Sequence, residues 1–152
     1  MPETDISLLF DLFILNQHVR RLFAAGLADA PLKADEYAVY SLLFELGPMT
    51  ATEMSRRTGM PLTTLLDYLH QAEVRGHLRR ERHPRDGRAR QLALTIAGVT
   101  AHRSTNVQWE VVRERLEGAL TVERADLRRA LQALDAAAVT ALAEFEPGAA
   151  AG

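Results

Sequence analysis

The sequence predicts a mainly α protein with one small β-hairpin (α+β), and two observations support this fold class. Apolar residues recur at helical spacing in separate segments from residue 4 to about residue 145. Residues 77–95 break that pattern, because two short strand-like runs there flank a turn at Pro84-Arg85-Asp86-Gly87. The predicted order is therefore four helices, two strands and two helices.

Composition narrows the class of protein. A chain of 152 residues with 47% hydrophobic and 25% charged residues is typical of one globular domain with a sizeable core. No apolar run reaches the roughly 18–20 residues of a membrane span, and the run at residues 6–15 lacks a basic leader and a cleavage site. We therefore expect a cytoplasmic protein that does not bind membranes. The lack of cysteine excludes disulfides, thiolate metal sites and thiol redox sensing.

The first predicted helices occupy residues 4–28 and 36–46, and Gly47-Pro48 ends the second. The second is apolar on most sides, which predicts burial. Thr50 and Glu53 form a capping-box pattern that opens a short helix at residues 51–57.

The next helix is predicted at residues 62–75, with Pro61 as its first residue and Gly76 after its end. A short capped helix, a tight turn and a second helix form a helix-turn-helix, and the hairpin that follows forms a wing. Helical spacing directs one face toward the core, at Leu65, Tyr68, Leu69 and Ala72. The opposite face carries Leu62, Thr63, Leu66, Asp67 and His70.

The hairpin is predicted as strands at about 77–83 and 88–95, with Leu78, Leu92 and Leu94 facing inward. Gly87 should supply a positive φ in the turn, and Asp86 should hold the Arg88 guanidinium. Seven arginines lie between residues 75 and 90. A solvated charge run is the alternative explanation for them.

Charge is distributed unevenly along the chain. Residues 51–103 contain ten arginines and five acidic residues, whereas the rest contains eight basic and fifteen acidic residues, so the net charge is only −2. A basic middle between acidic ends indicates a partner such as double-stranded DNA.

The N-terminal end of a recognition helix enters the major groove, where threonines bond phosphate or base edges and leucines contact thymine methyl groups. The first two turns hold no Arg, Asn or Gln, and Asp67 repels phosphate, so phosphate contacts and DNA shape should contribute much of the recognition. The alternative is an ordinary core helix. The predicted DNA-binding residues are Pro61, Leu62, Thr63, Thr64, Leu66, Asp67, His70, Arg85, Asp86, Arg88 and Arg90.

Catalysis and metal binding have little support. The chain has no nucleophile elbow, phosphate loop or HExxH motif, so we do not expect an enzyme or a cofactor. No two of the five histidines have the spacing of a helical metal site, although a zinc site built from distant residues stays open.

Two further helices are predicted at residues 96–118 and 122–145, and the breaker-rich residues 147–152 should be disordered. The stretch from Asp86 to Gly98 resembles the wing signature of MarR-family transcriptional regulators, which is D-x-R, an alternating strand and then L-T-x-x-G. The segments Tyr37-Ala38-Val39-Tyr40, Gly47-Pro48-Met49-Thr50, Glu53-Met54 and Arg75-Gly76 also match the usual order of that family.

The resemblance implies a homodimeric repressor that binds a pseudo-palindromic operator and inserts Arg88 into the minor groove. It implies an N-terminal dimerisation helix at 1–34, a winged helix-turn-helix at 35–98 and C-terminal dimerisation helices at 99–146. The family often has a basic residue where this chain has Asp67, so its sequence preference does not carry over.

The resemblance also implies a small aromatic or phenolic effector, bound between the dimerisation and DNA-binding parts. Its expected lining is His18, Leu22, Tyr37, Tyr40 and Trp109, with ordinary packing as the alternative for Trp109. Two other functions stay open, namely a ligand-independent DNA-binding regulator controlled by a protein partner and a winged-helix module that binds a protein surface.

Overall fold

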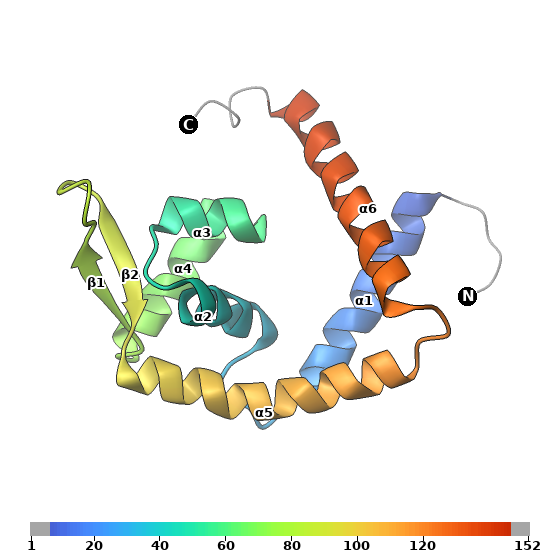
Figure 1. Ribbon diagram of the computed structural model, residues 1–152, viewed down its shortest axis with the longest axis horizontal. Coiled ribbons are helices and arrows are strands. Elements are labelled where there is room, and N and C mark those ends of the chain that lie inside the picture. The colour runs from blue at the N-terminus through green and yellow to red at the C-terminus, as the bar shows by residue number, and fades with distance from the viewer. Residues whose placement is uncertain (1–6, 147–152) are drawn as a thin grey trace. The chain divides into compact units, whose positions relative to one another are not determined.

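The computed structural model describes residues 7–146 of the chain and confirms the predicted order of elements. The first residues of the predicted N-terminal helix and the predicted disordered tail at 147–152 lie outside the described residues. The elements are α1 (Leu8–Gly26), α2 (Ala34–Leu46), α3 (Ala51–Thr58), α4 (Leu62–Val74), β1 (Leu78–Arg82), β2 (Arg90–Leu94), α5 (Ile96–Gly118) and α6 (Arg124–Phe145) (Figure 1).

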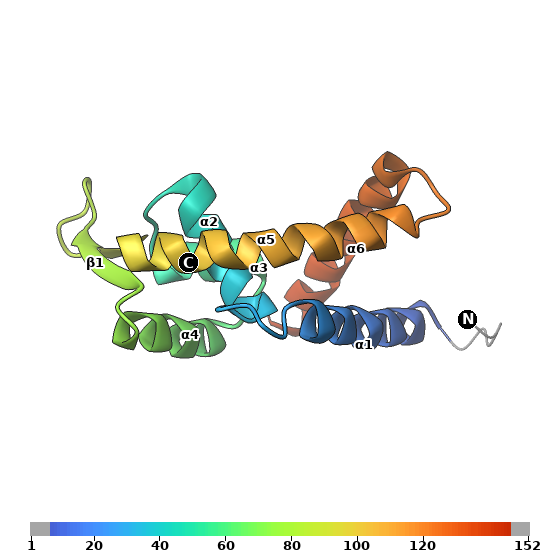
Figure 2. The same cartoon turned by 90° about the horizontal axis from the view of Figure 1, so that it is seen from below.

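The chain divides into two compact units. Residues 1–112 hold α1 to α4, the hairpin and most of α5, and residues 113–152 hold the end of α5 and α6. Within the first unit, α5 runs across one side of α2 and α4, with the hairpin at its beginning (Figures 1 and 2). No helix among residues 7–146 is both long and apolar enough to cross a bilayer.

The helix-turn-helix begins and ends close to the predicted residues. The Thr50 hydroxyl accepts a hydrogen bond from the Glu53 amide at 3.2 Å, and Gly59 ends α3 in the left-handed conformation. Only half of the predicted capping box forms, because the Glu53 carboxylate pairs with Arg57 at 3.1 Å instead. The helix α4 begins at Leu62, as predicted, and Pro61 is its N-cap and not a helical residue, because its ψ of 136° is extended.

The core of the first unit lies between α2, α4 and the hairpin. The predicted inward face of α4 is buried at Leu65, Leu69 and Ala72, whereas Tyr68 is only half-buried. The predicted strand residues Leu78 and Leu92 are buried, and Leu94 packs against the same cluster. The buried cluster comprises Leu32, Tyr37, Val39, Tyr40, Leu43, Met49, Met54, Leu65, Leu69, Ala72, Leu78, Leu92 and Ala101.

The hairpin has a third strand partner that the sequence did not indicate. In the β1–β2 register, Leu78 lies opposite Leu94 and Arg82 opposite Arg90. Met49, in the loop before α3, forms an antiparallel bridge to Leu92 through two backbone hydrogen bonds of 3.2 and 2.9 Å. A bridge of one residue leaves no alternation of apolar and polar residues in the sequence, so it could not be predicted. It attaches the base of the wing to the helix-turn-helix.

The L-T-x-x-G motif joins the end of α4 to the start of α5. The Thr95 hydroxyl donates to the Gly76 carbonyl at 2.6 Å and accepts from the Gly98 amide at 3.2 Å, so it caps α5. Gly76 has a φ of 73° and ends α4 in a Schellman arrangement, with the His77 amide bonded to the Ala72 carbonyl at 2.9 Å. A Cβ at Gly98 would lie 2.2 Å from the His77 carbonyl oxygen, so only glycine fits there.

We predict that Gly98→Ala lowers the free energy of unfolding by about 1–3 kcal/mol, because the added methyl group forces α5 away from β1. Urea denaturation followed by circular dichroism measures this. Gly87→Ala is the matched control, since nothing lies within 4 Å of its added Cβ and its φ is not positive. Equal stability of the two variants would contradict the account of this motif.

Candidate nucleic-acid interface

The outward face of α4 is exposed along its first two turns. Leu62 and Leu66 are 40% and 43% exposed, which is high for leucines in a helix that packs on a core. Thr63, Thr64, Asp67 and His70 are also exposed, and Pro61 immediately precedes the helix with an exposed ring. Their side chains form no hydrogen bond or ion pair with any residue in the described range. The face is therefore free to contact a partner through hydroxyl groups, methyl groups and one carboxylate.

A buried polar cluster fixes the other end of α4. The Arg75 guanidinium donates to the Glu36 carboxylate at 2.7 Å and lies 3.4 Å from the Tyr40 hydroxyl. That hydroxyl lies 3.1 Å from Nδ1 of His77, and the second Glu36 oxygen accepts from the Lys33 amide at 3.0 Å. Because the Glu36 carboxylate is buried, losing this cation would leave it with only the Lys33 amide as a partner among the described residues and would destabilise this end of α4.

The seven arginines between residues 75 and 90 fall into two groups. Three pair with other residues of the chain: Arg75 with Glu36, Arg80 with Glu73 at 2.6 Å, and Arg79 with Glu81 and the Leu94 carbonyl. The other four lie at the distal end of the hairpin, and their side chains have no hydrogen-bond or ion-pair partner among residues 7–146. They are Arg82, Arg85, Arg88 and Arg90.

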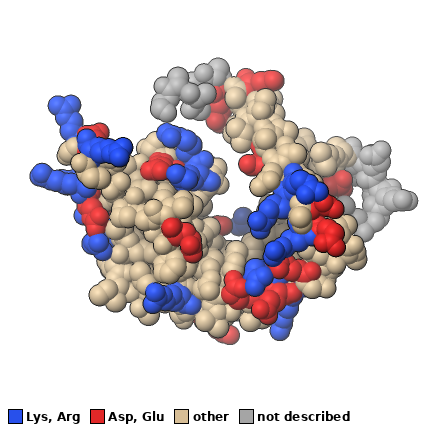
Figure 3. Space-filling model, viewed as in Figure 1, with Lys and Arg blue, Asp and Glu red and all other residues tan. Residues whose placement is uncertain are grey.

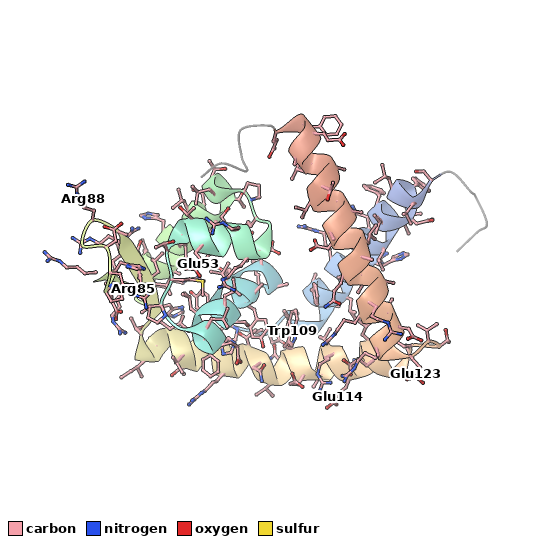
Figure 4. All side chains as sticks on the ribbon, turned by 45° about the horizontal axis from the view of Figure 1, so that its top comes forward. Glu53, Arg85, Arg88, Trp109, Glu114 and Glu123 are labelled. Carbon is pink, nitrogen blue, oxygen red and sulfur yellow. The ribbon has the colours of Figure 1, made fainter. Side chains whose placement is uncertain are left out.

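These four arginines, which we call the wing-tip arginines, gather where the hairpin projects from the first unit (Figure 3). Arg88 extends away from the turn (Figure 4). Arg82 and Arg90 lie directly opposite each other in the strand register, an arrangement of like charges that destabilises a hairpin. An anion placed between them would relieve this repulsion, so the wing tip is suited to bind phosphate.

Side-chain acceptors hold the wing turn in shape. Nδ1 of His83 accepts from the amides of Arg85 and Asp86, both at 3.1 Å, and the Asp86 carboxylate accepts from the Arg88 amide at 3.0 Å. The prediction that Asp86 holds the Arg88 guanidinium was therefore wrong. The Asp86 carboxylate accepts a hydrogen bond from the backbone amide of Arg88, and the Arg88 guanidinium has no partner among the described residues. The prediction of a positive φ at Gly87 was also wrong, because the described glycines with positive φ are Gly47, Gly59 and Gly76.

Three of the five residues predicted to line an effector site are packed inside the first unit. Tyr40 belongs to the core, and the Tyr37 hydroxyl donates to the Asn106 side chain at 2.5 Å. Trp109 lies on the inner side of α5 (Figure 4), where it stacks on Phe23 at 4.9 Å and contacts the Tyr37 ring at 4.6 Å. Of the remaining two, His18 is exposed on α1 and Leu22 is half-buried.

A cavity of about 380 Å³ lies between α1, the start of α2 and α4. None of the five predicted residues lines it. The sequence signal was present, because Arg20, Phe23, Ala24 and Leu27 fall at helical spacing on one face of α1, whereas the effector residues predicted on this helix were His18 and Leu22. The cavity is lined by Arg20, Phe23, Ala24, Leu27, Ala28, Lys33, Ala34, Asp35 and Tyr68.

The cavity combines an apolar wall with two cations and one carboxylate, Asp35, and reaches α4. Arg20 and Lys33 supply the positive charge, and Phe23 supplies an aromatic ring. At its rim the Tyr68 hydroxyl of α4 donates to the Asp35 carboxylate of α2 at 3.0 Å. A molecule in the cavity would therefore touch a side chain of the helix that presents the candidate DNA-reading face.

Comparisons with known proteins bear on the fold. No family model matches the chain, and no curated protein does. Solved structures do match: a probable transcriptional regulator from Pseudomonas aeruginosa is 26% identical, with a TM-score of 0.73 over 85% of this chain and 96% of its own. A mutant MarR from E. coli complexed with operator DNA is 22% identical, with a TM-score of 0.76 over 85% and 94%.

A third structure concerns the regulation of DNA binding of Bordetella bronchiseptica BpsR by 6-hydroxynicotinic acid. It is 18% identical, with a TM-score of 0.75 over 89% of this chain and 95% of its own. The chain has the MarR-family winged-helix fold. Within this MarR-type fold, α3 and α4 form the helix-turn-helix and the β1–β2 hairpin forms the wing, as the sequence predicts.

His102 is a buried titratable group between α2 and α5. Its ring stacks on Tyr37 at 5.0 Å and on Phe44 at 4.4 Å. The Ser41 hydroxyl donates to the Tyr37 carbonyl, so Nε2 of His102, 3.1 Å away, must donate to Ser41. Nδ1 has no partner among the described residues. Burial, with a smaller contribution from Arg103, lowers the pKa of His102 below its usual value.

We predict that the free energy of unfolding falls as the pH drops below about 6.5, the pKa of an unfolded histidine. A histidine whose folded pKa is lowered binds its proton more readily in the unfolded chain, so acid favours unfolding. His102→Gln should reduce the pH dependence between pH 7 and pH 5.5, while His77, whose pKa burial also lowers, retains its share. Urea titrations at fixed protein concentration measure both slopes. Identical slopes would contradict a neutral buried His102.

Proposed function

We propose that this chain is a sequence-specific DNA-binding transcriptional regulator that acts as a homodimer on a pseudo-palindromic operator. The observation that carries the proposal is the group of wing-tip arginines, which are unpaired and lie beside an exposed helix face. The other three arginines between residues 75 and 90 are each paired with a carboxylate of the chain. Free guanidinium groups at the end of a projecting hairpin suit a narrow minor groove, where the negative potential is enhanced. The operator complex of the E. coli MarR structure supports the proposal, since the two folds are similar.

Each part of the site has its own role in this proposal. The first turns of α4 enter the major groove, where Pro61, Leu62, Thr63 and Thr64 lie at the helix start. Leu66, Asp67 and His70 follow on the second turn. Arg85 and Arg88 reach the minor groove, Arg90 contacts the backbone, and Asp86 orders the turn through the Arg88 amide.

Exposed apolar side chains support the homodimer. On α1, Leu9 is 77% and Phe13 is 58% exposed. On α6, within the second unit, Val139 is 62% and Phe145 is 83% exposed. Neither helix contains a buried residue along its described length. Faces of this kind mark association surfaces in proteins, and a second copy of the chain would place two wings on a symmetric operator.

The cavity beside α4 supports control by a small molecule. Its cations and apolar wall suit an aromatic acid. Because Tyr68 of the recognition helix lines the cavity, a bound ligand would contact that helix directly. A ligand that prefers one position of α4 shifts the population toward that position. We propose repression that is relieved by such a ligand. A regulator controlled by a protein partner would bind DNA without responding to ligands, and a protein-interaction module would not bind duplex DNA even at low salt.

We predict that Arg88→Ala weakens binding to the operator by about 1–3 kcal/mol and lowers the slope of log affinity against log salt by about one. Fluorescence anisotropy over a salt series, with duplexes from the upstream region of the gene and a scrambled duplex, measures both, and saturation at two chains per site tests the dimer. Arg79→Ala is the matched control, because that arginine is engaged by Glu81 and should contribute little. Equal losses in both variants would refute the assignment of the wing tip.

We predict that 6-hydroxynicotinate or benzoate raises the melting temperature and weakens operator binding, because both carry a ring and a carboxylate that the cavity complements. Arg20→Ala should abolish both responses. Arg21→Ala is the control, because this neighbouring arginine is exposed and does not line the cavity. Responses that survive Arg20→Ala would place the effector elsewhere, and a lack of response to a wide panel of aromatic acids would favour the ligand-independent regulator.

A further inference from the structure

The outward face of α4 has an unusual chemical composition for a helix that reads DNA, and this inference rests on the function proposed above. Guanine is read by arginine or lysine donors, and adenine by the paired donor and acceptor of asparagine or glutamine. None of these residues occurs in the first two turns of α4, and Gln71 follows only in the third. Two leucines, two threonines and one carboxylate occupy the face instead.

Asp67 is the strongest hydrogen-bonding group on this face. Its side chain is exposed and forms no ion pair or hydrogen bond within the described part of the chain, and His70, one turn later, does not pair with it. Other carboxylates of the region are engaged: Glu53 with Arg57, Glu73 with Arg80 and Glu81 with Arg79. Asp67 therefore remains available as an acceptor in the second turn of the recognition helix.

A carboxylate in the major groove discriminates strongly between bases. It is repelled by phosphates and by the acceptors of guanine, thymine and the N7 edge of adenine, and it loses hydration as the groove closes around it. Cytosine and adenine both present an amino donor in the major groove, but the adenine amino group lies beside the N7 acceptor, so cytosine is the base with which Asp and Glu usually pair. The wing-tip arginines supply phosphate affinity elsewhere, so the protein tolerates an unfavourable charge that the cytosine amino group relieves.

Leu66 precedes Asp67 and extends the same reading surface. It is 43% exposed, and Leu62, one turn earlier on the same side, is 40% exposed. Because residues four apart in a helix stack on one side, the two leucines form a short apolar strip beside the Asp67 carboxylate. The apolar group available in the major groove is the thymine methyl.

We infer that Asp67 is the specificity-determining residue of the recognition helix, accepting a hydrogen bond from the amino group of a cytosine that lies beside a thymine in contact with Leu66. Each half-site of the operator then contains a cytosine that the protein requires and a thymine that it reads through its methyl group. Asp67 acts by excluding other bases at that position more than by adding affinity.

Selection from randomised duplexes tests this inference with the full-length protein and three variants. The wild type should select a two-fold motif with one required cytosine in each half. Asp67→Ala should keep the rest of the motif and lose the cytosine requirement, and Asp67→Asn should change the requirement from cytosine to adenine. Asp29→Asn removes an exposed carboxylate outside α4 and should leave the motif unchanged.

Anisotropy with the selected duplex then gives magnitudes. Replacing the cytosine pair by a thymine pair should weaken wild-type binding about tenfold to hundredfold, and Asp67→Ala should respond less than threefold. Replacing the neighbouring thymine by deoxyuridine removes only the methyl group and should weaken the wild type but not Leu66→Ala.

The outcomes separate this inference from the proposed function. If Asp67→Ala selects the wild-type motif and binds it more tightly, Asp67 only repels phosphate and the inference fails while the proposed function stands. If the wild type selects no motif, the proposed function fails and the inference fails with it. If Arg88→Ala weakens binding to all duplexes alike while the motif persists, the wing role and the Asp67 role are independent, as inferred.

Discussion

The ion pair between the buried Glu36 and the more exposed Arg75 is the constraint on which the candidate interface depends. Arg75 is the C-cap of α4, and Glu36 lies in the first turn of α2, so the pair fixes one end of α4 to the core. The free end then presents Leu62, Leu66 and Asp67 at a defined position. A helix held only by Leu65 and Leu69 could rotate about its axis, and a carboxylate that discriminates bases would lose its register.

The wing is likewise divided into a base whose groups are paired with the rest of the chain and a tip whose arginines are unpaired. Near its base, Arg80 is held by Glu73, and Met49 is paired with Leu92 through the backbone. Beyond that point the cations are unpaired, and Arg82 repels Arg90 across the strands. The protein thus keeps like charges together at the one place where a polyanion would neutralise them. This arrangement lowers the stability of the isolated hairpin and favours its ligand.

The sequence predicted the architecture well because helical periodicity, glycine helix ends and the alternating strands are local signals. It also predicted the exposed face of α4 from spacing alone. It could not predict atom-level partners in the turn, where Asp86 bonds an amide and His83 accepts two more. It did not indicate the cavity beside α4, because an aromatic residue such as Tyr37 gives the same sequence signal in a core as in a pocket, and only the tertiary structure brings Tyr68 next to Arg20. The predicted effector lining stays a prediction.

The bridge between Met49 and Leu92 has a mechanical consequence. Because it consists of two main-chain hydrogen bonds, it does not depend on which side chains occupy those positions, so substitutions there can change the core without detaching the wing. The hairpin is therefore joined to the loop before α3 at Leu92, and the turn that carries Arg85 and Arg88 lies beyond this point of attachment. The length of the segment between Arg82 and Arg90 then sets how far these two guanidinium groups lie from the helix-turn-helix.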